Sequence, residues 1–216
     1  MGFIHPGVPQ QLAARLTAEF KISTFVETGT HKGHTAAWAS ELYARVITIE
    51  GSELWFQKTS ERLAPYSNVT MLHGHSAQVL PEVITRLTGP ALFWLDAHWS
   101  GRQTAGAEDQ CPLLGEIAAI NTSAFDHFIL IDDARLFLSP PEPPHNVDQW
   151  PEIAAILAAL NSMRPKYAVV FEDAIIAVPP EARRLLQAYC LERQAAVKNR
   201  TFLEKAMHKL RPAGGR

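Results

Sequence analysis

The chain has 216 residues, of which 47% are hydrophobic and 19% are charged, so it can bury a core and does not have the composition of a disordered protein. Twenty Lys and Arg residues against 22 Asp and Glu residues leave a formal net charge of −2, which argues against nucleic acid as a partner. The longest apolar run, Ile153–Leu160, is too short to cross a membrane. Two distant cysteines and no readable targeting signal predict a cytoplasmic protein without a membrane partner.

Segments with helical and strand periodicity alternate along the chain. Strands are expected at 25–26, 45–50, 68–73, 91–96, 127–132, 166–171 and 174–178. Helices are expected at 9–20, 34–43, 53–63, 77–87, 112–120 and 151–163 and from 179 to 211, with Pro81 in the first turn or at the true start of its helix. This alternation predicts one α/β domain over residues 1–216, with a mostly parallel sheet between helices.

Two segments interrupt or close this pattern. Residues 139–151 hold five of the fifteen prolines, so we expect a loop rather than regular structure. Only Glu172-Asp173 separates the last two strands, which predicts a tight hairpin. The final 34 residues contain nine of the twenty Lys and Arg residues, which fits either a solvated helix face or contact with an acidic partner.

Ligands of such sheets bind beyond the carboxyl ends of the strands, so the residues that follow each strand are the informative ones. The first strand runs into a turn that contains Glu27, Gly29, Thr30 and Gly33. Glu50 ends the second strand, at the distance where an acid accepts hydrogen bonds from ribose hydroxyls. This combination predicts a nucleoside-containing cofactor, although an ordinary turn with a capping Glu is the alternative.

The turn does not have the glycine spacing of a dinucleotide site. Gly29 and Gly33 are separated by three residues, and the middle glycine of G-x-G-x-x-G is missing. Glu27 would repel a pyrophosphate, but it can hold an ammonium group. The turn therefore fits the amino-acid end of S-adenosylmethionine (SAM) better than the phosphates of NAD.

The ends of the next three strands carry further polar residues. His75 and Ser76 follow the third strand, where Ser76 can cap a helix or contact an adenine edge. Asp96 ends the fourth strand, and Asp132 and Asp133 end the fifth. If neighbouring strands bring the three Asp residues together, they require a cation or raised pKa values, and oxygen ligands favour Mg²⁺, Mn²⁺ or Ca²⁺ over zinc. The alternative is that they cap helices or loops.

With these residues, the chain resembles the class I SAM-dependent methyltransferases, and among them the metal-dependent catechol-type and bacterial sugar and macrolide O-methyltransferases. The resemblance spans roughly residues 24–178. It implies a Rossmann-like seven-stranded sheet with an antiparallel last strand. It also implies a role for each motif residue: Glu27, Gly29, Thr30 and Gly33 at the methionine part of SAM, Glu50 at the ribose, and His75 and Ser76 at the adenine. Asp96, Asp132 and Asp133 would hold the metal, and Asp96 would also lie beside the cofactor.

The resemblance implies methyl transfer to a hydroxyl of a small molecule or sugar, with Asp96 and His98 as the candidate catalytic residues. His98 stands where catechol-type enzymes place a Lys base, and Asp133 replaces their Asn; both departures weaken the case for a catechol substrate. Two loops, 97–110 and 139–150, leave the catalytic end of the sheet and are the natural substrate cover. The candidate substrate contacts on them are Trp99, Arg102, His145 and Trp150.

Several alternatives remain open. A metal-independent O- or N-methyltransferase would use His98 or Asp96 as its base, and a non-catalytic module would bind the cofactor only. A zinc site built from Asp96, His98 and Cys111 matches no standard ligand spacing. The C-terminal helices are able to pair two subunits, so we expect a homodimer.

Overall fold

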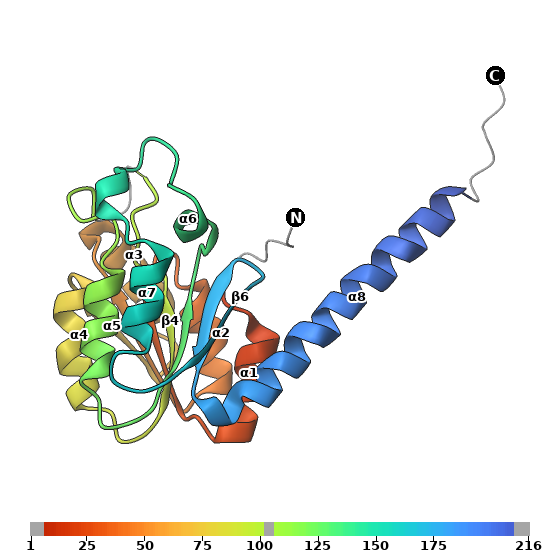
Figure 1. The fold of residues 1–216 in the computed structure, drawn as a ribbon. Coiled ribbons are helices and arrows are strands. Elements are labelled where there is room, and N and C mark those ends of the chain that lie inside the picture. The colour runs from red at the N-terminus through yellow and green to blue at the C-terminus, as the bar shows by residue number, and fades with distance from the viewer. Residues whose placement is uncertain (1–6, 102–105, 210–216) are drawn as a thin grey trace.

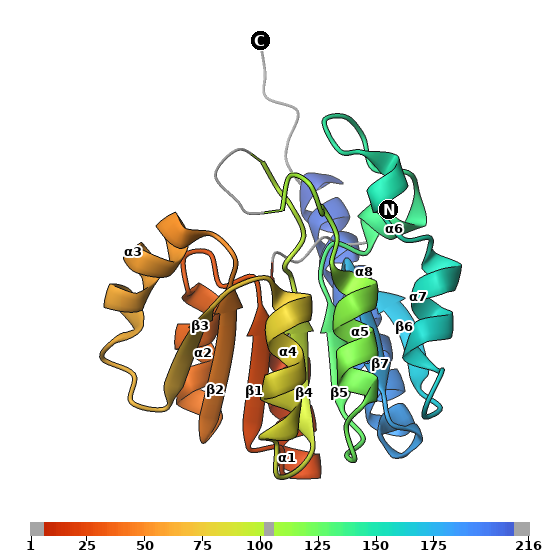
Figure 2. The ribbon, with the colours of Figure 1, turned by 90° about the vertical axis from the view of Figure 1, so that its left-hand side faces the viewer.

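The computed structural model of the protein describes residues 7–101 and 106–209, with side chains described as far as Asn199. Its strands form one seven-stranded sheet in the order β3-β2-β1-β4-β5-β7-β6 (Figures 1 and 2). The strands are β1 Thr24–Thr28, β2 Arg45–Glu50, β3 Val69–His73, β4 Ala91–Leu95, β5 Phe128–Ile131, β6 Tyr167–Phe171 and β7 Ala174–Val178. The first five are parallel, and β7 pairs antiparallel with both β5 and β6. The predicted Rossmann-like sheet with an antiparallel last strand is confirmed.

Helices cover both faces of this sheet. The helices are α1 Gln10–Phe20, α2 His34–Leu42, α3 Glu53–Leu63, α4 Ser76–Thr85, α5 Leu113–Asn121, α6 Arg135–Leu138, α7 Ile153–Leu160 and α8 Arg183–Lys209, with 3-10 turns at Val147–Gln149 and Pro180–Ala182. Leu80, Ile117 and Ile156 of α4, α5 and α7 are buried against one face. Leu12 and Leu186 of α1 and α8 are buried against the other. Because both faces are covered, the central strands are continuous apolar runs.

One sequence prediction about a helix is wrong. Pro81 was expected at the start of its helix, but it is the sixth residue of α4. The helix begins earlier because Leu80, Val83 and Ile84 form one apolar face that packs on the sheet. Pro81 lies on the exposed side of the helix, where the loss of one backbone N–H donor is tolerated.

The loops that position the site follow β4 and β5 and rise above the upper edge of the sheet (Figure 2). The predicted hairpin between β6 and β7 is confirmed, and both of its turn residues have positive φ, as a type I′ turn requires. Helix α8 leaves the sheet and projects away from it (Figure 1). Among the described residues, no helix combines the length and apolarity needed to span a bilayer.

Candidate active site

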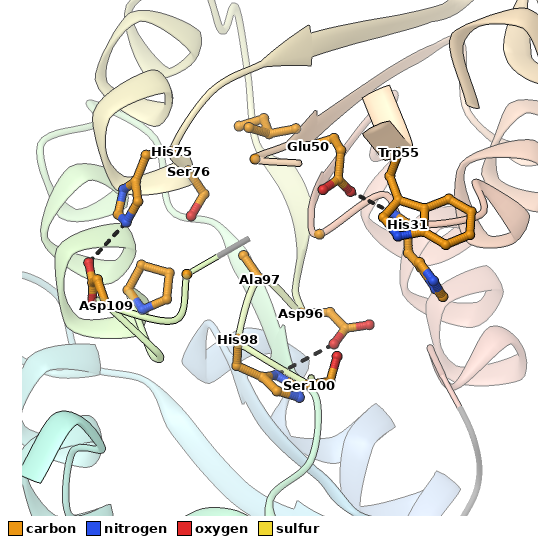
Figure 3. A pocket seen from close by; sticks show the side chains of 15 residues that line it. His31, Glu50, Trp55, His75, Ser76, Asp96, Ala97, His98, Ser100 and Asp109 are labelled. Carbon is orange, nitrogen blue, oxygen red and sulfur yellow. Dashed lines mark hydrogen bonds and ion pairs between the residues drawn. The ribbon is translucent and has the colours of Figure 1, made fainter. Parts of the chain in front are cut away.

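A pocket opens where β1, β2, β3 and β4 reach their carboxyl ends (Figure 3). Six residues predicted from the sequence line it: Gly29, Glu50, His75, Ser76, Asp96 and His98. Four separate strands contribute these side chains, so the parallel sheet is what brings them together.

The two glycines of the first turn have different physical roles. Gly29 has φ +83°, and a Cβ there would lie 2.1 Å from the backbone oxygen of Asp96, so only glycine lets the turn approach the end of β4 this closely. Gly33 has φ +71° and lies against Thr59 and Leu63 of α3. Gly29 lines the pocket, whereas Gly33 lets the start of α2 lie close to α3.

Glu27 and Thr30 lie beneath the pocket and not among the residues that line it. Thr48 Oγ1 donates a 2.6 Å hydrogen bond to Glu27 Oε2, and the Thr30 and Thr48 hydroxyl oxygens are 2.6 Å apart. Burial raises the pKa of Glu27 to about 8, so this carboxyl is protonated at neutral pH. A buried carboxyl of this kind ionises when a cation comes close to it.

Glu50 is held in place by two backbone donors. The backbone N–H of His31 donates to Glu50 Oε2 and that of Ser52 donates to Oε1, both over 2.7 Å. Each oxygen keeps a further acceptor position, as two ribose hydroxyls would require. The rings of His31 and Trp55, whose centroids are 4.3 Å apart, stand next to this carboxylate in the pocket wall.

The opposite wall comes from the start of α4 and the loop before α5. His75 Nε2 lies 2.9 Å from Asp109 Oδ2, which ties that loop to the third strand end (Figure 3). Ser76 Oγ is buried close to the Glu116 carboxyl but makes no hydrogen bond of full geometry among the described residues. A buried hydroxyl without a partner is costly unless a ligand satisfies it, so Ser76 is a candidate contact for a bound base.

The charged end of the pocket surrounds His98. Its Nε2 lies 2.8 Å from Asp133 Oδ2, and its Nδ1 lies 3.6 Å from Asp96 Oδ1. Arg135 Nη1 lies 2.6 Å from the other oxygen of Asp133. Burial alone would raise the pKa of Asp133, but His98 and Arg135 bring it below its usual value.

The neighbouring carboxyls shift in the opposite direction. Burial, together with the charges of Asp132 and Asp133, raises the pKa of Asp96 well above its usual value. Burial and the charge of Asp133 raise the pKa of Asp132 to about 6. Asp133 is therefore the member of the three that ionises most readily, because His98 and Arg135 lie next to it.

Several solved structures with a similar fold are methyltransferases. The O-methyltransferase TomG from Streptomyces achromogenes, involved in tomaymycin synthesis and solved with SAM, is 16% identical over 82% of each chain, with a TM-score of 0.55. An O-methyltransferase from Bacillus cereus, solved with SAH, is 15% identical over 81% of this chain and 83% of its own, with a TM-score of 0.56. The Podospora anserina methyltransferase PaMTH1, also with SAH, is 18% identical over 79% and 78%, with a TM-score of 0.53.

The chain has the methyltransferase fold. No protein-family model matches the sequence, and no curated protein matches it. The likeness to the solved structures concerns the fold, so the chemistry of this methyltransferase-like chain has to be argued from its own residues.

The predicted metal ligands do not form a metal site in this arrangement. The described residues contain no group of three or more His, Cys, Asp or Glu side chains placed to hold a metal ion. Both oxygens of Asp133 already face nitrogen atoms, those of His98 and Arg135. The zinc alternative fits no better, because Asp96, His98 and Cys111 do not come together as a metal-binding group among the described residues.

Three of the four predicted substrate contacts come together, but away from the pocket wall. The Trp99 and His145 ring centroids are 5.5 Å apart, and those of His145 and Trp150 are 5.1 Å apart. Trp150 is buried, and its ring packs against His98 with centroids 5.6 Å apart. Arg102 lies outside the described residues. Through Trp150, the cluster therefore packs against the His98 ring.

Several pocket residues were not predicted from the sequence: His31, Trp55, Ser100 and Asp109. Glu116 was also missed, although it is a fully buried acid in the first turn of α5, beneath the pocket, and burial raises its pKa. A single charge within the apolar run of α5 was the available signal for Glu116. No local pattern marks the other four, which lie in loops or on an exposed helix.

Proposed function

We propose that this protein is a SAM-dependent O-methyltransferase that acts on a hydroxyl of a small molecule or sugar. The observation that carries the proposal is the pocket, where Gly29, Glu50, Ser76 and Asp96 converge from four strand ends of a methyltransferase fold. Each residue has the chemistry that one part of the cofactor requires.

The residues present fit the cofactor. Glu50 offers acceptor positions to two ribose hydroxyls, and Ser76 Oγ and Trp55 Nε1 are buried polar atoms in the pocket wall without a partner among the described residues. Glu27, whose buried carboxyl is protonated at neutral pH, would ionise against the ammonium group of the cofactor. When bound, SAM supplies a methyl group on a positively charged sulfur.

His98 is the candidate base. Its Nε2 donates to Asp133, so the neutral ring keeps Nδ1 as an acceptor, and the side chain lines the pocket. Nδ1 is able to take the proton of an acceptor hydroxyl as its oxygen attacks the methyl group. Asp133 holds the ring in this tautomer and stabilises the imidazolium that forms.

Calorimetric titration with SAM and, separately, with NAD⁺ tests the cofactor. We expect micromolar binding of SAM and none of NAD⁺. Glu50→Ala should weaken SAM binding at least about tenfold, since the ribose loses charge-assisted hydrogen bonds worth roughly 1.5–3 kcal/mol each. The matched control is Glu61→Ala, which removes an exposed acid of α3 that does not line the pocket.

Absence of SAM binding by the wild-type protein would end the proposal. Transfer of the methyl group is tested with isotopically labelled SAM and a panel of sugars and hydroxylated aromatics. Binding of SAM without transfer to any acceptor would favour the alternative that the protein is a non-catalytic cofactor-binding module.

A further inference from the structure

Five ionisable side chains beside the pocket alternate between acid and base: Asp96, His98, Asp133, Arg135 and Asp173. His98 lies between Asp96 and Asp133, at 3.6 Å and 2.8 Å. Arg135 Nη1 contacts Asp133 Oδ1 over 2.6 Å and also contacts the Asp173 carboxylate. The members come from the loop after β4, the turn after β5, the start of α6 and the β6–β7 turn. They form one row, in which each ionisable base has an acid on both sides.

The row occupies the place where the sequence predicted a divalent metal. A metal ion bound to Asp133 would have to share its oxygens with the His98 and Arg135 nitrogens. It would also add two positive charges beside a guanidinium that is fixed there. Both oxygens of Asp133 that would bind a metal are therefore already engaged by side chains of this chain.

Arg135 is held in position by the hairpin turn. Its backbone N–H donates to Asp173 Oδ1 over 3.0 Å, and the backbone N–H of Ala134 donates to the Asp173 carbonyl oxygen over 2.8 Å. The Asp173 side chain is 7% exposed. The turn thus fixes both the start of α6 and the guanidinium that faces Asp133, so the second cation of the row is built into the fold.

We propose that His98 and Arg135 take the place that the sequence assigned to a metal, with His98 as the proton acceptor and Arg135 as the fixed positive charge, and that this chain transfers the methyl group without a metal ion. The inference rests on the proposed function. The acceptor oxygen forms its bond to the methyl carbon while the carbon–sulfur bond breaks and leaves its electron pair on sulfur. The hydroxyl proton goes to His98 Nδ1. His98 is the catalytic residue, and Asp133, Arg135 and Asp173 are positioning residues.

Binding of Mn²⁺ tests the inference without requiring the acceptor. The full-length protein is treated with EDTA, desalted and titrated with Mn²⁺, with free Mn²⁺ followed by electron paramagnetic resonance, in the presence and absence of SAM. We expect no stoichiometric site in the wild-type protein. In His98→Gln/Arg135→Gln, Asp133 and Asp173 lose the guanidinium and Asp133 also loses its imidazole partner, so Mn²⁺ affinity should rise at least about tenfold.

Arg135→Lys is the matched control, because it keeps the charge and should not gain Mn²⁺ affinity. Circular dichroism and SAM titration of the same samples report whether each variant is folded. One Mn²⁺ per wild-type chain, lost in Asp132→Asn, would overturn the inference, and this wild-type arm decides even if the double variant does not fold. If the wild-type protein binds both Mn²⁺ and SAM, this inference fails and the proposed function stands. If the wild-type protein does not bind SAM, the proposed function fails.

Discussion

Glu27 shows how burial changes the chemistry of one residue. Its carboxyl is completely buried at the end of β1 and accepts a hydrogen bond from Thr48. Its pKa is raised to about 8, against about 4.5 when exposed. Between these two values the folded protein keeps a proton that the unfolded chain releases, so stability falls as the pH rises from about 4.5 to about 8 and is constant above.

Glu27→Gln should remove this pH dependence. Relative to the wild-type protein, the variant is expected to gain up to about 1.4 kcal/mol of unfolding free energy for each pH unit between pH 5 and pH 8, measured by urea unfolding. Glu61→Gln, an exposed change, controls for the loss of a carboxylate. Parallel stability curves for the wild-type protein and Glu27→Gln would show that Glu27 is not protonated in the fold.

For single residues, the sequence indicated which side chains belong to the site better than it indicated where they lie. A buried acid before a glycine turn and an acid at the next strand end are local patterns, and both residues lie at the pocket or directly beneath it. The lack of hydrogen-bond partners at Ser76 Oγ and Trp55 Nε1 could not be predicted from local sequence, because it depends on all the side chains packed around these atoms.

Among the elements, the two loops above the sheet are joined through one side chain. Gln110 Oε1 accepts hydrogen bonds from the Asn146 backbone N–H over 2.8 Å and from Trp150 Nε1 over 3.2 Å. The Gln110 backbone N–H donates to Gln149 Oε1, and its carbonyl oxygen accepts from the Trp99 backbone N–H. The loops after β4 and β5 are thus tied into one cover behind His98.

Gln110→Ala should loosen this cover. Two donors lose their acceptor in a largely buried position, so we expect a loss of about 2–4 kcal/mol in unfolding free energy and faster proteolysis within the two loops. Gln57→Ala, an exposed glutamine of α3, is the control. A change below about 0.5 kcal/mol, the usual range for surface substitutions, would contradict the role of Gln110.

The order of the elements was predictable because each strand and helix has its own apolar period. The short helix α6 was not predicted, since four residues between a turn and a proline-rich loop carry no period of their own. The position of Pro81 was misjudged for a related reason: a tertiary contact, the packing of Leu80 and Val83 on the sheet, outweighed a local signal.

For the whole molecule, the main open feature is helix α8, which projects from the sheet (Figure 1). Its described part carries Leu191 with 66% of its surface exposed. A single exposed leucine is common on protein surfaces, so Leu191 is a position at which a second copy can be tested and not evidence for one. The sequence-based expectation of a homodimer therefore stays a prediction, and Leu191 is the residue at which we test it.

Sedimentation equilibrium should give twice the chain mass of 23.9 kDa for the wild-type protein. Leu191→Glu should shift the protein towards monomer, because a charge would be buried between the subunits. Met163→Glu alters a residue of similar exposure, 67%, away from α8, and should leave the dimer intact. A wild-type monomer at micromolar concentration would contradict the expectation.

The sequence by itself determined the alternation of strands and helices, the antiparallel hairpin at the end of the sheet, and which polar residues follow each strand. These properties depend on residues close together in the chain, through apolar periodicity, glycine turns and acids at strand ends. Only the tertiary structure decided that His98 reaches Asp133 and that Arg135 and Asp173 complete a row of alternating acids and bases. The strand order β4-β5-β7 places these segments side by side, and charge balance among side chains that are distant in sequence exists only after the sheet has assembled.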